Sequence, residues 1–502
     1  MTRPIETTPA PGRRDALRRL LVGAGLAPLA TQARAVGGTA WSAAIQVYPA
    51  APPDNATTPS MITDTHGNSV AVWYDVSDSG SLQGATLAAG AFNASGEPAW
   101  VPTSAVAASN VVASFSYDSV VGMDAAGDAM AVWTDGVFIY VARLAAGGAT
   151  WSPATIVNTP IPTEIVADPS IAVAANGNAV AVWSSSAHPY DITVFANAYD
   201  ASISLWRAQV DVLGGPVEFL LSTHQLGIDA VGDAVIAFSS TSNNAAAAAY
   251  DFAGDTWTPI ASTYAVPAIA VIAVDAAGNA TFVALQEDDS TVALTLPFNQ
   301  TAFASMTTLS TTSGLLSSLP AVTVDPGGSV VAVWPDATGG LASARLASPA
   351  GTWNALPTLP LSNGPPYSLV LGIGAQGNAI AAWAVFAGGR SHIQSALLAA
   401  GASAWTPAVD VSAPGDTDQN PQVVLTARGD AIAMWQDNGE GDAGTIESAA
   451  LTDAFAASPA ALEVPAMRRP GVVTMAVMLG GSALVALRRR KSARLRRPPD
   501  SD

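Results

Sequence analysis

A phrase of thirteen residues recurs eight times in the chain and constrains its fold more than any other feature. It is clearest at residues 171–183, which read IAVAANGNAVAVW, two apolar stretches around a polar turn. The glycines of the eight turns lie 46 to 60 residues apart, at Gly67, Gly127, Gly177, Gly232, Gly278, Gly328, Gly377 and Gly429. A repeat of this length indicates one structural unit per copy.

Each copy of the phrase predicts two β-strands joined by a tight turn. An aspartate opens the turn in several copies, and the glycine closes it because glycine adopts a left-handed backbone easily. We interpret these aspartates as turn residues first: Asp124, Asp229, Asp275 and Asp325. Alanine and valine alternate in residues 179–182, so both faces of the second strand are apolar and we expect it to be buried on both sides.

Two tryptophan positions accompany the repeat. The first lies six residues after the glycine, at Trp73, Trp133, Trp183, Trp334, Trp383 and Trp435, with Phe238 in the fourth copy and Ala284 in a degenerate fifth copy. A second hairpin follows and carries the second tryptophan, at Trp100, Trp151, Trp206, Trp257, Trp353 and Trp405. Four strands in about 50 residues are typical of a propeller blade, whereas a parallel β-helix has shorter coils without regular hairpins.

The two ends of the repeat region complement each other. The eighth copy ends near residue 451 without its tryptophan strand, and a matching strand with Trp41 stands at residues 40–47. Pairing them would close a ring and leave no long open sheet edge. The sequence therefore predicts an all-β fold, a β-propeller of eight four-stranded blades over residues 36–455. A seven-bladed or irregular ring is the alternative, because the fifth copy is degenerate.

The N-terminus, residues 1–35, predicts an export signal. Arg13 and Arg14 precede an apolar run at residues 20–30, and residues 33–35 form an A-x-A cleavage site. The paired arginines resemble the twin-arginine pattern, which implies export of a folded protein. A general secretory signal is the alternative.

The C-terminus predicts a membrane anchor. Residues 456–470 form a linker, residues 471–487 are an apolar stretch, and residues 488–502 form a basic tail. Seventeen helical residues span roughly 25 Å, slightly less than a ~30 Å hydrocarbon core. The basic cluster orients the tail toward the cytoplasm and the body outside.

This C-terminus resembles the IPTL-CTERM and PEP-CTERM sorting signals of exported bacterial proteins. Val464, Pro465, Ala466 and Met467 match the start of the motif and Gly471 its glycine, whereas residues 468–470 differ from it. The resemblance implies transient anchoring, recognition by an exosortase-like sorting protease, and processing toward the cell surface or matrix. A permanent single-span anchor is the alternative.

Charge and composition limit the possible partners. Between residues 36 and 465 there are 5 arginines and 35 acidic residues, so the body repels phosphate backbones and we expect no nucleic-acid partner. The same charge would attract calcium or cationic surfaces. There are no cysteines, so the fold depends on packing without disulfides.

The candidate binding residues follow the first tryptophan of four repeats, where connections of unequal length begin. They are Asp75, Asp135, Asp336 and Asp437. We predict that these connections and the loops between blades share one variable, acidic binding face. Solvated turns capped by aspartate are the alternative. Asp437, Glu440 and Asp442 have the oxygen-rich side chains of a weak calcium site, without the full spacing of a known calcium loop.

The repeat also resembles, in architecture only, the Asp-box of sialidase-like propellers. Catalysis there would require clustered arginines, and we interpret Arg143 and Arg345, which share one blade position, as structural. The four histidines show no metal-ligand spacing, and we expect them at the surface. The sequence favours a non-catalytic binding, adhesion or matrix module that contacts glycan, matrix or protein. The alternatives are a glycan hydrolase or lyase on the same ring, and a passive coat component.

Overall fold

The computed structural model describes residues 40–455, except for short gaps at 49–55, 77–79, 110, 112–119, 189–190, 216, 219–223, 239–245, 261–268, 287–289, 313–318, 360, 362–363, 365, 388, 415–416 and 439–443. The predicted export signal, sorting motif, anchor and basic tail lie outside the described residues. Among the residues that are described, no helix is long and apolar enough to cross a membrane.

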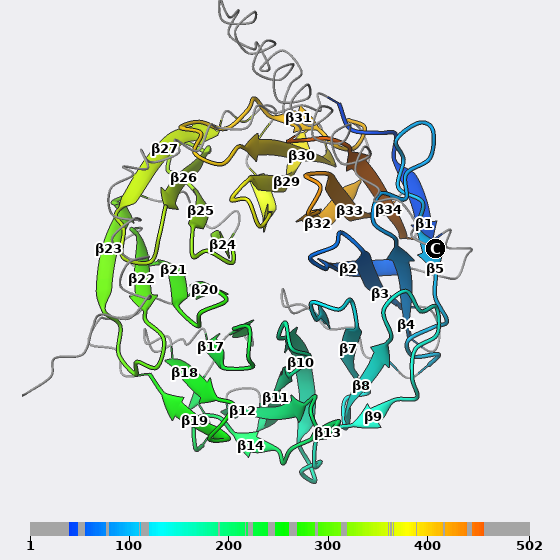
Figure 1. The fold of residues 1–502 in the computed structure, drawn as a ribbon, viewed down its shortest axis with the longest axis vertical. Coiled ribbons are helices and arrows are strands. Elements are labelled where there is room, and N and C mark those ends of the chain that lie inside the picture. The colour runs from blue at the N-terminus through cyan, green and yellow to red at the C-terminus, as the bar shows by residue number, and fades with distance from the viewer. Residues whose placement is uncertain are drawn as a thin grey trace, which may run out of the picture. The chain divides into compact units, whose positions relative to one another are not determined.

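Eight antiparallel sheets form a ring around a central axis (Figure 1). Each sheet is a blade, and its strands follow one another from the centre outward. We number the blades 1 to 8, from the sheet that begins with β2 (Ala56–Thr63) to the sheet that begins with β32 (Asp418–Leu425). The predicted eight-bladed propeller is confirmed, and the degenerate fifth copy forms a complete blade.

The strands occupy four positions in the blades. The other inner strands are β6 (Val121–Met123), β10 (Ile165–Val173), β16 (His224–Ile228), β20 (Ile269–Val274), β24 (Ala321–Val324) and β28 (Pro366–Ile373). The second strands are β3 (Ser69–Asp75), β7 (Ala129–Thr134), β11 (Ala179–His188), β17 (Ala234–Phe238), β21 (Ala280–Leu285), β25 (Val330–Pro335), β29 (Ala379–Ala387) and β33 (Ala431–Asp437).

The third strands are β4 (Ser81–Leu87), β8 (Ile139–Leu144), β12 (Asp191–Asp200), β18 (Ala246–Asp251), β22 (Thr291–Leu296), β26 (Leu341–Leu346), β30 (Arg390–Leu398) and β34 (Thr445–Leu451). The outer strands are β5 (Val101–Pro102), β9 (Thr155–Ile156), β13 (Leu205–Trp206), β19 (Thr256–Pro259), β23 (Ser305–Ser310), β27 (Trp353–Leu359), β31 (Val409–Asp410) and β1 (Ile45–Tyr48). In blade 3, β14 (Val210–Asp211) and β15 (Val217–Glu218) also pair with β12.

The N-terminal strand closes the ring as the sequence predicts. β1 pairs antiparallel with β34 and becomes the outer strand of blade 8. The backbone N–H of Ser42 donates to the carbonyl of Ala450 at 2.8 Å, which extends the pairing beyond β1. The last blade is therefore built from both ends of the repeat region.

The second strand of each blade lies in the core. Every residue of β7, β17, β21 and β25 is buried, as expected for a strand with two apolar faces. The first tryptophan packs there: Trp383 and Trp435 are fully buried. In blade 5 Ala284 is buried at that position, and Phe282, two residues earlier on the same face, supplies the aromatic ring.

Each blade presents its turns to two opposite faces of the ring. In an antiparallel meander the first and third turns lie at one end and the second turn at the other. We call the first end the turn face. The other end, with the connections between blades, is the loop face. All eight repeat glycines have positive φ, between 76° and 117°, which confirms the predicted left-handed turn conformation.

The second, outer tryptophans connect neighbouring blades. The indole N–H of Trp405 in blade 7 donates to the Ser343 hydroxyl of blade 6 at 2.9 Å. The same kind of bond joins Trp41 to Ser395 at 3.0 Å, Trp100 to Ser448 at 3.1 Å, and Trp151 to Thr103 at 3.0 Å. These indoles therefore fill the junction between two blades and satisfy their own polar group there.

Candidate functional site

The repeat aspartates of the turn face serve the backbone. The Asp229 carboxylate accepts the N–H groups of Val231, Gly232 and Asp233 at 2.8, 2.8 and 2.9 Å. Asp124, Asp275 and Asp325 accept backbone N–H groups two and four residues ahead in the same way. Their interpretation as turn residues is confirmed.

The residue after the turn glycine has a role in seven of the eight blades that the sequence reasoning missed. The Asn378 side-chain oxygen accepts the Ala400 N–H of the other turn in its blade at 2.7 Å, and Asp233 accepts the Phe252 N–H at 2.7 Å. The same bond occurs at Asn68, Asp128, Asn178, Asn279 and Asp430. The recurrence of Asn or Asp at this position was the available signal.

On the loop face, Asp135 and Asp336 cap their own turns. Asp135 accepts the N–H of Val137 at 2.9 Å, the N–H of Phe138 at 2.7 Å and the Tyr140 hydroxyl at 2.8 Å. Burial opposes ionisation of Asp135, but these hydrogen bonds outweigh it and the pKa of the carboxyl is lowered. Asp336 accepts from Thr338 and Gly340, and its pKa is lowered by the same balance.

The other two predicted binding residues occupy the same position in blades 1 and 8, as the last residues of β3 and β33. Asp75 is 4% exposed at the end of β3. Asp437 pairs with Asp418 across β33 and β32, and ligand oxygens of these two and Glu447 lie within 4.8 Å of one another. Thus the structure brings acids together at Asp437, but it leaves the four predicted binding residues on four different blades.

Of the three predicted calcium ligands, the structure describes Asp437 alone. Glu440 and Asp442 lie outside the described residues, so the predicted set with Asp437 stays a prediction. Carboxylate oxygens are suitable calcium ligands, and titration calorimetry with calcium would test the set.

Two of the histidines are buried, so the expectation of surface histidines is wrong for them. His224, on inner strand β16, is 3% exposed, and burial lowers its pKa to about 4. His392, on β30, is also 3% exposed, and its Nε2 lies 3.3 Å from a carboxylate oxygen of Asp410. Alternation within a strand can bury a histidine, and the spacing of metal ligands does not reveal this.

Arginines fill three of the junctions between blades on the turn face. Arg345 of blade 6 donates to the carbonyls of Ala399, at 3.2 Å, and Gly377 in blade 7. Arg143 of blade 2 donates to the Tyr199 hydroxyl of blade 3 and lies 3.9 Å from Asp128. These contacts support a structural role for both arginines.

Arg207 fills the junction between blades 3 and 4 from the outer strand. Its guanidinium lies 4.1 Å from the centre of the Phe252 ring and donates to the Phe252 carbonyl at 2.7 Å. It also pairs with Asp200 at 3.4 Å and Asp255 at 3.2 Å. The result is a guanidinium held between an aromatic face, a carbonyl and two carboxylates.

Blade 5 replaces the outer tryptophan by a phenylalanine. The Ala304 N–H donates to the Thr295 carbonyl at 2.9 Å, as the Thr406 N–H donates to the Leu397 carbonyl in blade 7. Phe303 therefore occupies the position of Trp405. Its ring meets that of Phe282 edge to face, with 5.0 Å between the centroids. Without an indole N–H, this junction has lost the bond between blades.

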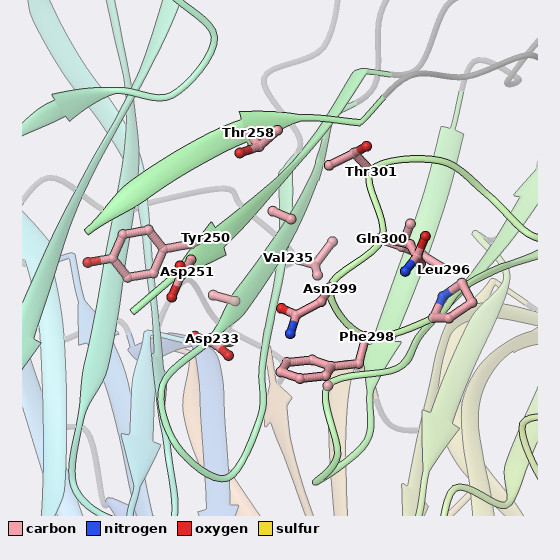
Figure 2. Close-up of a pocket in the computed structure, with 14 residues that line it drawn as sticks. Asp233, Val235, Tyr250, Asp251, Thr258, Leu296, Phe298, Asn299, Gln300 and Thr301 are labelled. Carbon is pink, nitrogen blue, oxygen red and sulfur yellow. The ribbon is translucent and has the colours of Figure 1, made fainter. Parts of the chain in front are cut away.

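A cavity of about 140 Å³ opens between blades 4 and 5 on the turn face (Figure 2). Figure 2 shows Phe298 and Asn299 of the blade 5 turn pointing toward Asp233 of blade 4. Phe298 is 40% exposed. The lining comprises Asp233, Ala234, Val235, Ala249, Tyr250, Asp251, Thr258, Gly278, Leu296, Pro297, Phe298, Asn299, Gln300 and Thr301.

The cavity is acidic. Partial burial raises the pKa of the Asp233 carboxyl, the Phe252 N–H opposes this, and the charges of Asp229 and Asp251 add to the rise. The Tyr250 hydroxyl donates to Asp255 at 2.7 Å, and burial together with this bond raises its pKa. The lining thus combines carboxylates, amides, an exposed aromatic ring and an apolar floor, a composition suited to binding.

No family model and no curated protein sequence matches the chain. Among solved structures, the chain is similar to the BP39L lectin from Burkholderia pseudomallei, with 12% identity over 72% of this chain and 100% of that one and a TM-score of 0.46. It is also similar to the fucose-specific lectin from Aleuria aurantia, with 12% identity over 61% and 96% and a TM-score of 0.36. The Hadza microbial sialidase Hz136 shows 13% identity over 67% and 74%, with a TM-score of 0.34.

Proposed function

We propose that the chain is an exported, non-catalytic binding module whose ring holds its ligand at the junction of blades 4 and 5. The observation that carries this proposal is the open acidic cavity there, beside the exposed Phe298. Aromatic residues and convergent polar groups around a concave site are typical of ligand binding.

The carboxylates of the cavity and those of the loop face both accept backbone N–H groups: Asp233 accepts from Phe252, and Asp251 accepts from the turn that follows it. Asp135, Asp336 and the repeat aspartates hold turns through their oxygens, so their abundance has a structural cause. Ligand contacts by Asp75, Asp135, Asp336 and Asp437 on the loop face remain predictions.

We also propose that residues 1–35 direct export and that residues 471–487 anchor the protein in the envelope, with the ring outside. Support for this part comes from the sequence: an apolar run before an A-x-A site at one end, and an apolar stretch before basic residues at the other. Processing by an exosortase-like protease, with release to the cell surface or matrix, belongs to the same proposal.

Binding of the full-length protein to envelope and matrix fractions of bacterial cells tests the function. We expect saturable binding that the double variant Phe298→Ala, Asn299→Ala weakens about tenfold or more. Asn93→Ala, in the corresponding turn of blade 1, is the control and should bind as the wild type does. Turnover of glycosides or polysaccharides by the purified protein would replace this proposal with the hydrolase or lyase alternative.

A further inference from the structure

The repeat allows each residue of the cavity to be matched to its equivalent at other junctions. Ala249 pairs with Val235, three residues after the turn glycine of blade 4. In blades 2 and 6 the residues with that register are Arg143, opposite Met130, and Arg345, opposite Val331. Ala249 therefore stands where two other blades place an arginine that crosses to the next blade.

The outer strand shows the same replacement. Thr258 pairs with Ala249 in blade 4, and Arg207 donates its backbone N–H to Ala198, the equivalent of Ala249 in blade 3. Thr258 therefore stands at the position of Arg207. At the junction of blades 4 and 5, both of these arginine positions carry short, uncharged side chains.

The groups that surround those guanidiniums are nevertheless present in the cavity. Asp233 follows the turn glycine of blade 4, which is the position of Asp128 beside Arg143 in blade 2. Asp251 is the last residue of the third strand, which is the position of Asp200 beside Arg207 in blade 3. Both Asp233 and Asp251 line the cavity. The cavity thus contains the equivalents of two carboxylates that lie beside arginines in other blades. Blade 4 itself has no arginine at these positions.

The aromatic and backbone groups correspond as well. Phe298 donates its N–H to Asn279 as Phe252 does to Asp233, so Phe298 is the equivalent of the ring that Arg207 covers. The ring rests on Gly278, where a Cβ atom would come within 2.3 Å of it.

Gly278 and Pro297 both line the cavity. They are the equivalents of Gly377 and Ala399, whose carbonyls accept from Arg345. Acceptors that serve a guanidinium elsewhere in the ring are therefore repeated at this junction.

We propose that the cavity between blades 4 and 5 binds the guanidinium of an arginine side chain supplied by a partner protein or peptide. This inference rests on the proposed function and names its ligand. Two carboxylates provide charge-assisted hydrogen bonds and Phe298 provides a cation–π face. A cavity of about 140 Å³ takes the end of one side chain, since pockets for drug-sized molecules measure ~300–1,000 Å³. The acidic body draws cationic partners toward it.

Capped arginine and capped citrulline, titrated into the full-length protein and followed by ligand-observed NMR and calorimetry, test the inference. Citrulline keeps the shape and loses the charge. We expect arginine to bind about tenfold or more tightly than citrulline, with capped lysine between them, and to weaken as salt rises. Equal binding of arginine and citrulline would overturn the inference, and so would binding of neutral monosaccharides in place of arginine.

Two variants locate the site. Ala249→Arg supplies the cavity with a guanidinium from its own blade, so it should abolish arginine binding. Thr295→Arg adds the same charge at the equivalent position of blade 5, outside the cavity, and should leave binding nearly unchanged. Loss in both variants, or in neither, would contradict the assignment. Saturable binding to envelope material without any preference for arginine would refute the inference and leave the proposed function standing.

Discussion

The junction between blades 6 and 7 and the junction between blades 4 and 5 use the same repeat positions for different purposes. At the first, Arg345 crosses to two carbonyls and Trp405 donates to Ser343. At the second, Ala249 and Phe303 occupy those positions, and a cavity opens beside Phe298. The compared positions have the same register in both junctions, so we attribute the difference between a sealed and an open junction to their side chains. Sealing stabilises the ring, and an opening offers a place for a ligand.

The largest effect is expected from Arg345→Ala, which removes the side chain that seals the junction of blades 6 and 7. Arg345 is 9% exposed, and its loss removes a charged donor from two carbonyls: the Gly377 carbonyl loses its side-chain donor, whereas the Ala399 carbonyl keeps the N–H of Ala402. We expect the free energy of unfolding to fall by about 2–4 kcal/mol, measured by urea denaturation at an unchanged m-value. A loss below about 0.5 kcal/mol would contradict a sealing role.

A pH effect of somewhat smaller size is expected in blade 4, from His224. Its pKa is about 4 in the folded protein against 6.5 for the unperturbed group, so the unfolded chain binds the proton first. Stability is therefore full above pH 6.5 and falls as the pH drops toward 4, by up to about 3 kcal/mol. His224→Gln should flatten that part of the stability profile, whereas an unchanged slope would show that other groups cause it.

Two variants, one that adds a hydroxyl at the open junction and one that removes the equivalent hydroxyl from the sealed junction, should lower the stability by smaller amounts. Ala247, which shares an apolar cluster with Phe303, is the equivalent of Ser343 by its register with Ala237. Ala247→Ser buries a hydroxyl at a junction that lacks an indole donor and should cost about 1–3 kcal/mol. Ser343→Ala removes the acceptor of Trp405 and should cost about 1 kcal/mol. Thermal denaturation of both variants checks this, and a gain in stability from either would break the comparison.

The smallest change in stability is expected from Ala249→Arg, the variant that closes the cavity. Ala249 is half-buried at the edge of an acidic cavity, so the new guanidinium meets Asp233 and Asp251. We expect the free energy of unfolding to stay within about 1 kcal/mol of the wild type. A loss of several kcal/mol would show that the cavity cannot hold a guanidinium.

The ring itself could be predicted from the sequence because its markers are local. The turn glycines, the aspartates that open the turns and the Trp41 strand that completes blade 8 are needed by the backbone whatever lies around them. The blade count followed from them even where Ala284 replaced the tryptophan.

The site could not be predicted because its cavity opens where two repeat positions lack the arginine that other blades carry. Ala249 and Thr258 are ordinary strand residues in sequence, and only the register shows that they replace arginines. Phe303 escaped notice because only tryptophan marked this position, although Phe303 follows its turn glycine by 25 residues, as Trp257 and Trp353 do. Acidic residues on the loop face attracted attention instead, although the turns of Asp135 and Asp336 already use their carboxylates.

Hydrogen exchange of the full-length protein, with and without saturating capped arginine, tests the central claim most directly. Binding at the junction of blades 4 and 5 predicts added protection in residues 233–251 and 278–303, with none in the equivalent residues 329–347 and 377–405 of the sealed junction. Protection confined to the loop face around residues 134–139 and 335–341, or equal at both junctions, would contradict the account.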